Sequence, residues 1–475
     1  MNLVFQEEAF MAKSATKKGV LERISGGAAA FMQKFLPDAF LFAVVLTVIV
    51  FIASMLATGQ GPLAMLNHWG KGVWGLLAFS MQMVLVLVTG HVLALAPPFK
   101  KLLVKLAGIP KTPFQGIALV TIVSFVACIL NWGFGLVIGA IYAKEIAKKL
   151  RGIDYRLLIA SAYAGFVWWH AGFSGSIPLS ISTQPAAGAA IANTGGTMTQ
   201  AASIAETLFS PTNLFIILVS LIVLPILTTL MHPKNEEDVI SINPSLLEEE
   251  EAPKVTREQI AAMSPAEKLE NLPIINLALG AMGVVYIVLY FSGLASFNLD
   301  LNIVNFIFLI AGVILHWTPR SLLNAVGEAA KGAGGIVLQF PLYAGIQAMM
   351  VGGNADGVSL ASVISSFFVS ISTVKTFPFF TFLSAGIVNF FVPSGGGQWA
   401  VQGPVMLPAA QEIGVELPKV AMAIAYGDSW TNMIQPFWAL PALGIAKLGA
   451  RDIMGYTLIV LIVTGIIAAL GLLLF

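Results

Sequence analysis

Charged side chains are scarce in this sequence. Asp, Glu, Lys and Arg make up 10% of its 475 residues, whereas soluble domains carry about 25%. Hydrophobic residues make up 57%, so the composition excludes a soluble globular protein and indicates an integral membrane protein. The net charge of +1 gives no reason to expect a nucleic-acid partner. The single cysteine, Cys128, excludes an intramolecular disulfide.

Catalytic and metal-binding patterns are also missing. The histidines are scattered, there is no HExxH spacing and no cysteine pair, so we expect no metal site, no cofactor and no enzymatic activity. Ser174 lies in GFSGS, which resembles a hydrolase nucleophile elbow, but no α/β sheet is predicted around it. The first residues contain no compact apolar run with a small-residue cleavage site, so we expect no removable signal peptide.

Long apolar runs predict the membrane crossings, at roughly 20 residues each. They lie at 37–58, 75–97, 155–181, 212–230, 273–293, 301–318, 333–351, 418–446 and 453–475. Two further apolar stretches, 113–147 and 376–411, are interrupted by Gly and polar residues. We interpret each as a re-entrant hairpin, because irregular backbone survives in a membrane only where protein or a cavity surrounds it.

The basic residues predict the orientation. With a cytoplasmic N-terminus, only Lys71, Lys375 and Lys419 of the 25 Lys and Arg residues fall outside, as the positive-inside rule requires. Lys111 and Lys144 flank the first hairpin, which we therefore place on the cytoplasmic side. The second hairpin has acidic residues on its C-terminal flank and fits the outer side.

The two halves of the sequence follow the same order of a hairpin and then a span broken by Gly, Ser and Pro. Gln82 precedes Asn131 by 49 residues, and Gln339 precedes Asn389 by 50. An extra span at 273–293 inverts the second half, which favours an inverted-topology repeat over two unrelated Gly-rich helix pairs. The predicted organisation is a cytoplasmic N-terminal segment (1–36), repeat 1 (37–231), a cytoplasmic acidic linker (232–272), the inverting span (273–300) and repeat 2 (301–475).

Polar residues at the hairpin tips and helix breaks are the candidates for a substrate site, because such groups are costly at membrane depth. No Lys or Arg lies in a predicted span centre, so an anion would be held by neutral donors and half-helix N-termini. We expect the hairpin tips and breaks to meet in one cavity. The predicted substrate-binding residues are Asn131, Gly133, Gly135, His170, Ser174, Ser176, Ser394, Gly395, Gly396, Gly397, Gln398, Thr431 and Asn432.

Asp428 is the only acid predicted in the interior of a span, because the other carboxylates lie in loops or near span ends. One interpretation is a packing carboxylate satisfied by Ser429, Thr431 or Asn432. The other is a cation-coupling group, assisted by Ser429, that binds Na⁺ or carries H⁺. His170, in the equivalent break of the first half, is either a hydrogen-bonded structural histidine or a proton-sensitive group.

Three segments carry a resemblance to a known family: WWHAGFSGSIPLSIST (168–183), FVPSGGGQWAVQGP (391–404) and AYGDSWTNMIQPFWALPALG (425–444). The sequence resembles the short-chain fatty acid transporter family, within the wider ion-transporter superfamily. The resemblance implies uptake of acetoacetate, butyrate and similar monocarboxylates across the bacterial inner membrane. It also implies an all-α fold with scaffold and transport domains, an elevator-type motion, contact with membrane lipid and a homodimer.

Two other functions remain as alternatives. A di- or hydroxycarboxylate transporter of the same superfamily would need further cationic or donor groups for the extra negative charge. A membrane-embedded enzyme would need a catalytic constellation at one depth, and the sequence contains none.

Overall fold

A computed structural model describes residues 20–35, 39–182, 190–191, 193–242, 247, 263–293, 301–331, 333–393 and 395–475. Every regular element within these ranges is a helix. The predicted site residue Ser394 lies outside the described residues.

The first half of the chain contains the first predicted hairpin and the first broken span, with other helices before and after them. They are α1 (Val20–Phe35), α2 (Ala39–Thr58), α3 (Pro62–Gly72), α4 (Leu77–Leu95), α5 (Pro97–Leu106), α6 (Pro113–Leu130), α7 (Trp132–Lys149), α8 (Tyr155–Ala164), η1 (Trp169–Ala171), α9 (Ser176–Ser182) and α10 (Pro211–Leu230).

The linker and the second half of the chain contain the other helices. These are η2 (Glu236–Asp238), α12 (Pro265–Glu270), α13 (Pro273–Ser292), α14 (Leu301–Leu315), α15 (Pro319–Ala330), α16 (Gly334–Val351), α17 (Leu360–Ser370), α18 (Phe377–Phe391), α19 (Gly395–Ile413), α20 (Leu417–Thr431), η4 (Asn432–Ile434), α21 (Pro436–Ala446) and α22 (Ala450–Leu474).

A helix or a pair of helices occupies each predicted crossing, and two helices joined at Asn131 occupy the predicted hairpin at 113–147. α6 is a continuous helix of 18 residues, and it is one of four described helices that are long and apolar enough to cross a membrane, with α10, α13 and α22. The interruption is confined to Asn131, which ends α6 and whose side-chain oxygen accepts the Phe134 N–H at the start of α7. One capping residue is enough to turn the chain, because it satisfies a backbone group that the helix end leaves open.

Both predicted hairpins are pairs of antiparallel helices in close contact. A Cβ atom on Gly135 of α7 would lie 2.3 Å from the backbone nitrogen of Cys128 on α6, so only glycine permits this approach of the two legs. In the second hairpin, the Gln402 side chain of α19 donates to Ser384 Oγ of α18 at 3.0 Å. The legs of each hairpin therefore begin and end at the same end of the molecule.

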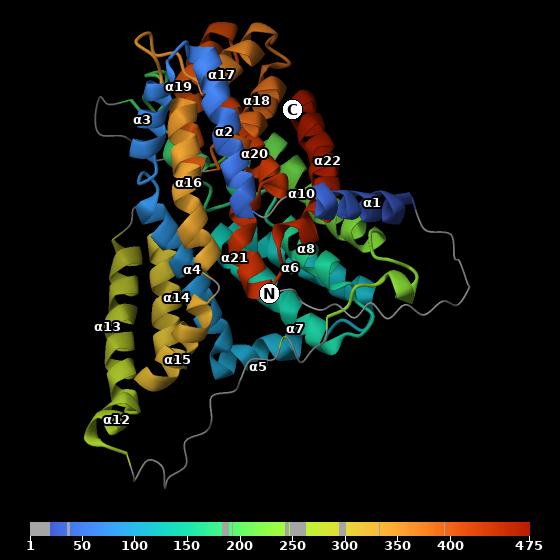
Figure 1. The fold of residues 1–475 in the computed structure, drawn as a ribbon, viewed down its shortest axis with the longest axis vertical. Helices are drawn as coiled ribbons and strands as arrows, with labels where there is room; N and C mark the ends of the chain where they lie inside the picture. The colour runs from blue at the N-terminus through green and yellow to red at the C-terminus, as the bar shows by residue number, and fades with distance from the viewer. Residues whose placement is uncertain are drawn as a thin grey trace.

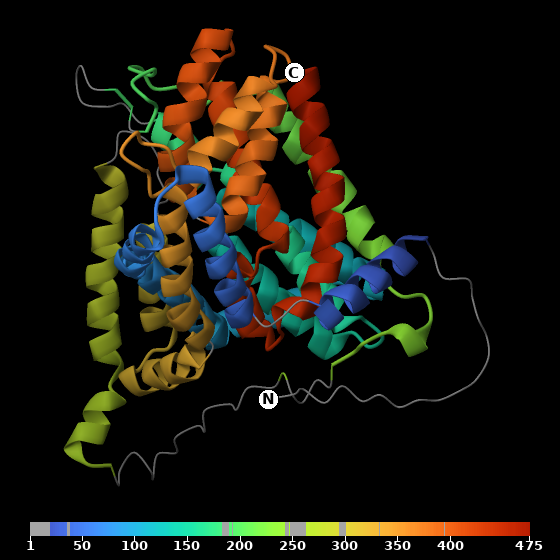
Figure 2. The same cartoon turned by 45° about the horizontal axis from the view of Figure 1, so that its top comes forward.

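The helices pack in two groups that lie side by side (Figures 1 and 2). One group contains α2, α3, α4 and α13 to α16, with bonds such as Ser54 Oγ to the Met349 carbonyl at 3.1 Å. The other contains the two hairpins, the broken helices, α10 and α22. The groups meet where Phe340 of α16 stacks on Phe437 of α21, with ring centroids 3.9 Å apart.

The order of helices in the first half recurs in the second. The run of α2 to α5, the hairpin α6–α7, the broken helix α8–α9 and α10 corresponds to α14 to α17, α18–α19, α20–α21 and α22. In Figure 1, α5, α12 and α15 lie towards the lower end, whereas α17 and the C-terminus lie towards the upper end. The inverted relation between the halves stays a prediction.

The linker is not a free tether along its whole length. The Tyr155 N–H donates to the Ile240 carbonyl at 2.9 Å, and the Ile240 N–H donates to Asp154 Oδ2 at 2.9 Å. Asp154 also caps α8 by accepting the Leu157 N–H. Burial raises the pKa of the Asp154 carboxyl, although these two backbone bonds act to lower it. The first residues of the linker are therefore fixed to the start of the first broken helix.

Candidate functional site

The first helix break is attached to the tip of the first hairpin. α8 ends at Ala164, and the chain passes through η1 before α9 begins. The Phe173 N–H donates to the Ile129 carbonyl at 2.8 Å, and Ser174 Oγ accepts the Trp132 N–H at 3.0 Å. The predicted site residues Asn131 and Ser174 thus both bond backbone N–H groups at the start of α7.

The second break is attached to the second hairpin in a similar way. α20 ends at Thr431, whose hydroxyl donates to the Gly386 carbonyl of α18 at 2.9 Å. The Asn389 side-chain amide donates to the same hydroxyl at 2.9 Å. η4 follows, and Gln435 then caps α21 by accepting the Phe437 N–H at 2.6 Å. Pro436 at the first helical position fits this start, since proline has no N–H to satisfy there.

The two breaks bind each other through a pair of parallel rings. Trp169 and His170 are consecutive in η1, and their rings stack with centroids 4.2 Å apart and an interplanar angle of 4°. Trp169 Nε1 donates to Asn432 Oδ1 at 2.9 Å, and His170 Nδ1 lies 2.9 Å from Asp428 Oδ2. Asp428 and Asn432 are one helical turn apart, so two neighbouring rings of one break reach two successive turns of the other.

The hydrogen bonds of His170 define its tautomer. The Ile177 N–H donates to His170 Nε2 at 2.9 Å, so Nε2 carries a lone pair and the proton lies on Nδ1. The imidazole is therefore neutral and donates to the Asp428 carboxylate. Both side chains have 0% exposure. One oxygen of Asp428, Oδ2, is thus bonded by a residue of the other break, and the expected partners Ser429, Thr431 and Asn432 do not supply this bond.

The tip of the second hairpin lies against these rings. A Cβ atom on Gly395 would come within 2.7 Å of His170 Cε1 and 3.1 Å of the Trp169 ring, so the contact requires glycine. Gly396 is exposed, and Gly397 is half-buried. The Gln398 amide donates to the Ala385 carbonyl at 2.8 Å within the hairpin.

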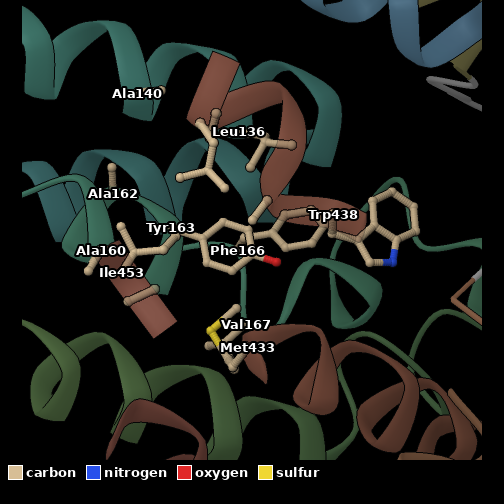
Figure 3. Packing of buried hydrophobic residues seen from close by; sticks show 14 of the residues in the cluster. Leu136, Ala140, Ala160, Ala162, Tyr163, Phe166, Val167, Met433, Trp438 and Ile453 are labelled. Atoms are coloured by element: carbon tan, nitrogen blue, oxygen red, sulfur yellow. The ribbon is translucent and has the colours of Figure 1, made fainter. Parts of the chain in front are cut away.

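An aromatic cluster links the first hairpin tip to both breaks. The Trp169 ring centroid is 5.6 Å from that of Trp132 and 5.4 Å from that of Trp438. The rings of Tyr163 and Phe166 continue the cluster, and Figure 3 shows them beside Trp438. Edge-to-face and offset pairs of this kind are favourable beyond the area they bury, so they stabilise the packing of the hairpin tip against the two breaks.

Several buried polar atoms around the breaks have no hydrogen-bond partner within the described ranges. They are Asp428 Oδ1, Asn432 Nδ2 and Gln435 Nε2 at the second break, and Asn389 Oδ1 and Gln398 Oε1 in the hairpin packed against it. The parent side chains have 0% exposure. An unsatisfied buried donor or acceptor costs about 1–3 kcal/mol, and such groups call for an explanation such as a bound ligand. No cluster of three His, Cys, Asp or Glu residues that could hold a metal occurs among the residues described.

The other predicted residues have more local roles. The Ser429 hydroxyl donates back to the Ala425 carbonyl at 3.0 Å, and Ser176 begins α9. Gly133 and Gly135 lie buried in α7. Sequence analysis missed Trp169 as a donor to Asn432 and missed Gln435 altogether. The Gln435–Pro436 pair was the available signal, because proline at the first helical position marks the preceding residue as the cap.

Comparison with known proteins relates the chain to one protein family. A sequence profile described as "Short chain fatty acid transporter" matches residues 20–475. A protein of Escherichia coli strain K12, provisionally named a short-chain fatty acid transporter, is 46% identical over 456 residues, covering 96% of this chain and 100% of that protein. A Haemophilus influenzae protein with the same provisional name is 45% identical over 453 residues, covering 95% of this chain and 99% of that protein.

A solved structure is also similar. The YdaH transporter of Alcanivorax borkumensis aligns with a TM-score of 0.41 and 14% identity, covering 92% of this chain and 97% of that chain.

Paired helical hairpins and interrupted apolar helices are typical of a multi-pass membrane transporter. Within that class, the profile match and the two relatives place the protein more narrowly. The chain belongs to the short-chain fatty acid transporter family.

Proposed function

We propose that the protein is a secondary active transporter that takes up short-chain monocarboxylates such as acetoacetate and butyrate. The observation that carries this proposal is the contact between the two helix breaks. Among the described residues, it leaves buried amide donors without partners beside an aromatic cluster. Amide donors suit a carboxylate, and aromatic rings suit a short aliphatic tail. Binding without a basic side chain is weaker and more easily reversed, as a transport cycle needs.

A monocarboxylate fits this site better than a di- or hydroxycarboxylate. A second negative charge buried without a cationic partner costs several kcal/mol. The side chains bonded across the two breaks are Trp169, His170, Asp428 and Asn432, and none of them is Lys or Arg. Dicarboxylate uptake is therefore the competing outcome of the transport experiment below.

Asp428 and His170 form the proposed coupling group. The carboxylate has one oxygen bonded to His170 and one oxygen without a partner among the residues described. That second oxygen can bind Na⁺ with backbone carbonyls of the broken helix, or it can accept H⁺. Ser429, the next residue of α20, is proposed to assist Asp428 in cation coupling.

The proposed mechanism is an elevator-type movement of the group that holds the hairpins and breaks against the group of α2 to α4 and α13 to α16. The recurring helix order in the two halves supports an inverted-topology repeat with re-entrant hairpins. We further propose a homodimer in a bacterial inner membrane with the N-terminus in the cytoplasm, since the basic residues favour that orientation.

The test is transport by the purified protein in liposomes. Uptake of labelled butyrate and acetoacetate is measured against labelled succinate, under a sodium gradient at equal pH and under a pH gradient at equal sodium. We expect monocarboxylate uptake above that of protein-free vesicles under one of the two gradients. Uptake of succinate in preference to both monocarboxylates would overturn the substrate class, and no dependence on either gradient would overturn cation coupling.

A further inference from the structure

Two side-chain amides at the second break have orientations that leave their NH₂ groups unused. Asn432 Oδ1 accepts the Trp169 Nε1–H, and Gln435 Oε1 accepts the Phe437 N–H. Because each oxygen already receives an N–H, neither amide can be flipped without placing two donors against each other. Asn432 Nδ2 and Gln435 Nε2 therefore remain as buried donors without a partner in the described part of the chain.

These two donors lie at the beginning of α21. Asn432 opens η4, and Gln435 is the cap of α21, a helix of 11 residues. The N-terminus of such a helix carries partial positive charge and favours anions. Two buried NH₂ groups and a helix N-terminus thus lie on one turn of the chain.

From this geometry we propose that Asn432 and Gln435 bind the carboxylate of the substrate, an inference that rests on the proposed transport of monocarboxylates. Each amide donates to the carboxylate, and the start of α21 supplies the remaining positive potential. Hydrogen bonds to an ionised acceptor are roughly twice as strong as neutral ones, so the anion satisfies both donors better than a neutral ligand does.

The position of Trp169 indicates where the tail of the substrate lies. Its indole nitrogen is 2.9 Å from Asn432 Oδ1, so the aromatic cluster begins next to the proposed carboxylate site. The rings of Trp132 and Trp438 follow at centroid distances of 5.6 and 5.4 Å from the Trp169 ring. We infer that the apolar chain of a substrate whose carboxylate is bound by the amides lies on the side of this aromatic cluster.

The test uses two variants that remove only the donor. In Gln435→Glu, one oxygen still accepts the Phe437 N–H, and in Asn432→Asp, one oxygen still accepts the Trp169 N–H, while the NH₂ group becomes a second oxygen. Binding of labelled butyrate to the purified protein, and competition by neutral butyramide, are measured for the wild type and both variants. Gln82→Glu is the matched control, because Gln82 donates to Asn302 in an exposed contact between α4 and α14 that includes neither break.

We expect the wild type to prefer butyrate over butyramide. Each donor variant should lose butyrate affinity by about tenfold or more, from the loss of a hydrogen bond to a charged group. Its affinity for butyramide should change much less, and Gln82→Glu should keep the wild-type preference.

Two results would overturn the inference. One is a wild type that binds butyramide as tightly as butyrate, which needs no variant to fold. The other is a folded Gln435→Glu or Asn432→Asp protein with wild-type butyrate affinity. A wild type that binds succinate but not butyrate is a different failure, because it refutes the proposed substrate class before the position of the carboxylate is tested.

Discussion

Replacing Asp428 by Asn should separate transport from accumulation. In the structure, His170 Nδ1–H donates to Asp428 Oδ2 at 2.9 Å, and both side chains are fully buried. Asn keeps a carbonyl oxygen for this bond and places its NH₂ group where the second oxygen, Oδ1, has no described partner. The variant therefore keeps the contact between the breaks but can neither bind Na⁺ as an anion nor carry H⁺.

The magnitudes favour a folded variant. A hydrogen bond to a charged group contributes about 1.5–3 kcal/mol and a neutral one about 0.5–1.5 kcal/mol, so Asp428→Asn should cost on the order of 1 kcal/mol. Asp428→Ala would instead leave the His170 donor buried and unsatisfied, at about 1–3 kcal/mol. Thermal unfolding of the two variants should show the larger loss for Ala.

The gradient sets an upper limit on the accumulation ratio that the transport assay can show. One unit of pH corresponds to 1.36 kcal/mol, so coupling of one substrate to one proton allows about tenfold accumulation per pH unit, and a tenfold sodium gradient allows the same for one sodium ion. Protonated short-chain acids also cross lipid unaided, so protein-free vesicles define the background, and the sodium arm is run at equal pH. Under whichever gradient drives the wild type, Asp428→Asn should accumulate no more substrate than protein-free vesicles do.

Exchange is the internal control. Vesicles loaded with unlabelled substrate should still take up labelled substrate through Asp428→Asn, because exchange needs binding and movement but no coupling ion. If the variant accumulates substrate to the wild-type ratio, Asp428 only holds the breaks together and the coupling assignment is wrong. If exchange and accumulation are both lost from a folded variant, the residue serves binding or movement and not coupling alone.

Three further predictions follow from other parts of the structure. Gly395→Ala should destabilise the protein by about 1–3 kcal/mol through overpacking, because its Cβ would lie 2.7 Å from the His170 ring. Gly396→Ala is the control and should leave the thermal midpoint unchanged, because nothing lies within 4 Å of its Cβ. Equal thermal midpoints for the two variants would contradict the packing. Trp438→Ala should shift the preference in competition binding from butyrate towards longer acids by removing part of the aromatic cluster, and an unchanged chain-length profile would count against the tail position. A cysteine at Gly414 in a cysteine-free background should react with impermeant reagent from the outside, and labelling from the inside alone would refute the inverted repeat.

The sequence determined the class and most of the helices. Scarce charge and long apolar runs are sufficient for the prediction of crossings, because the cost of polar groups in lipid acts on each segment separately. Gly, Pro and Asn marked the turns of both hairpins and the approximate positions of both breaks. The short helices α1, α3, α5, α15 and α17 were missed, because their mixed polar and apolar faces do not produce a long apolar run.

Tertiary structure decided the use of each polar residue. Asn131, Ser174 and Gln398 are polar residues near a tip or break. In the fold, Asn131 and Ser174 accept backbone N–H groups at the start of α7, and Gln398 bonds within the second hairpin. Composition could not distinguish them from Asn432 and Gln435, whose oxygens are bonded and whose NH₂ groups are left over.

The contact between the breaks is the clearest case. His170 and Asp428 are 258 residues apart in the chain, and Trp169 and Asn432 are 263 apart. Hydropathy and spacing describe what one segment does in lipid, and they contain no information about which distant segment faces it. Only the packing of the two hairpins around η1 and η4 brings these residues within hydrogen-bond distance, since each donor finds its acceptor after the helices have been placed.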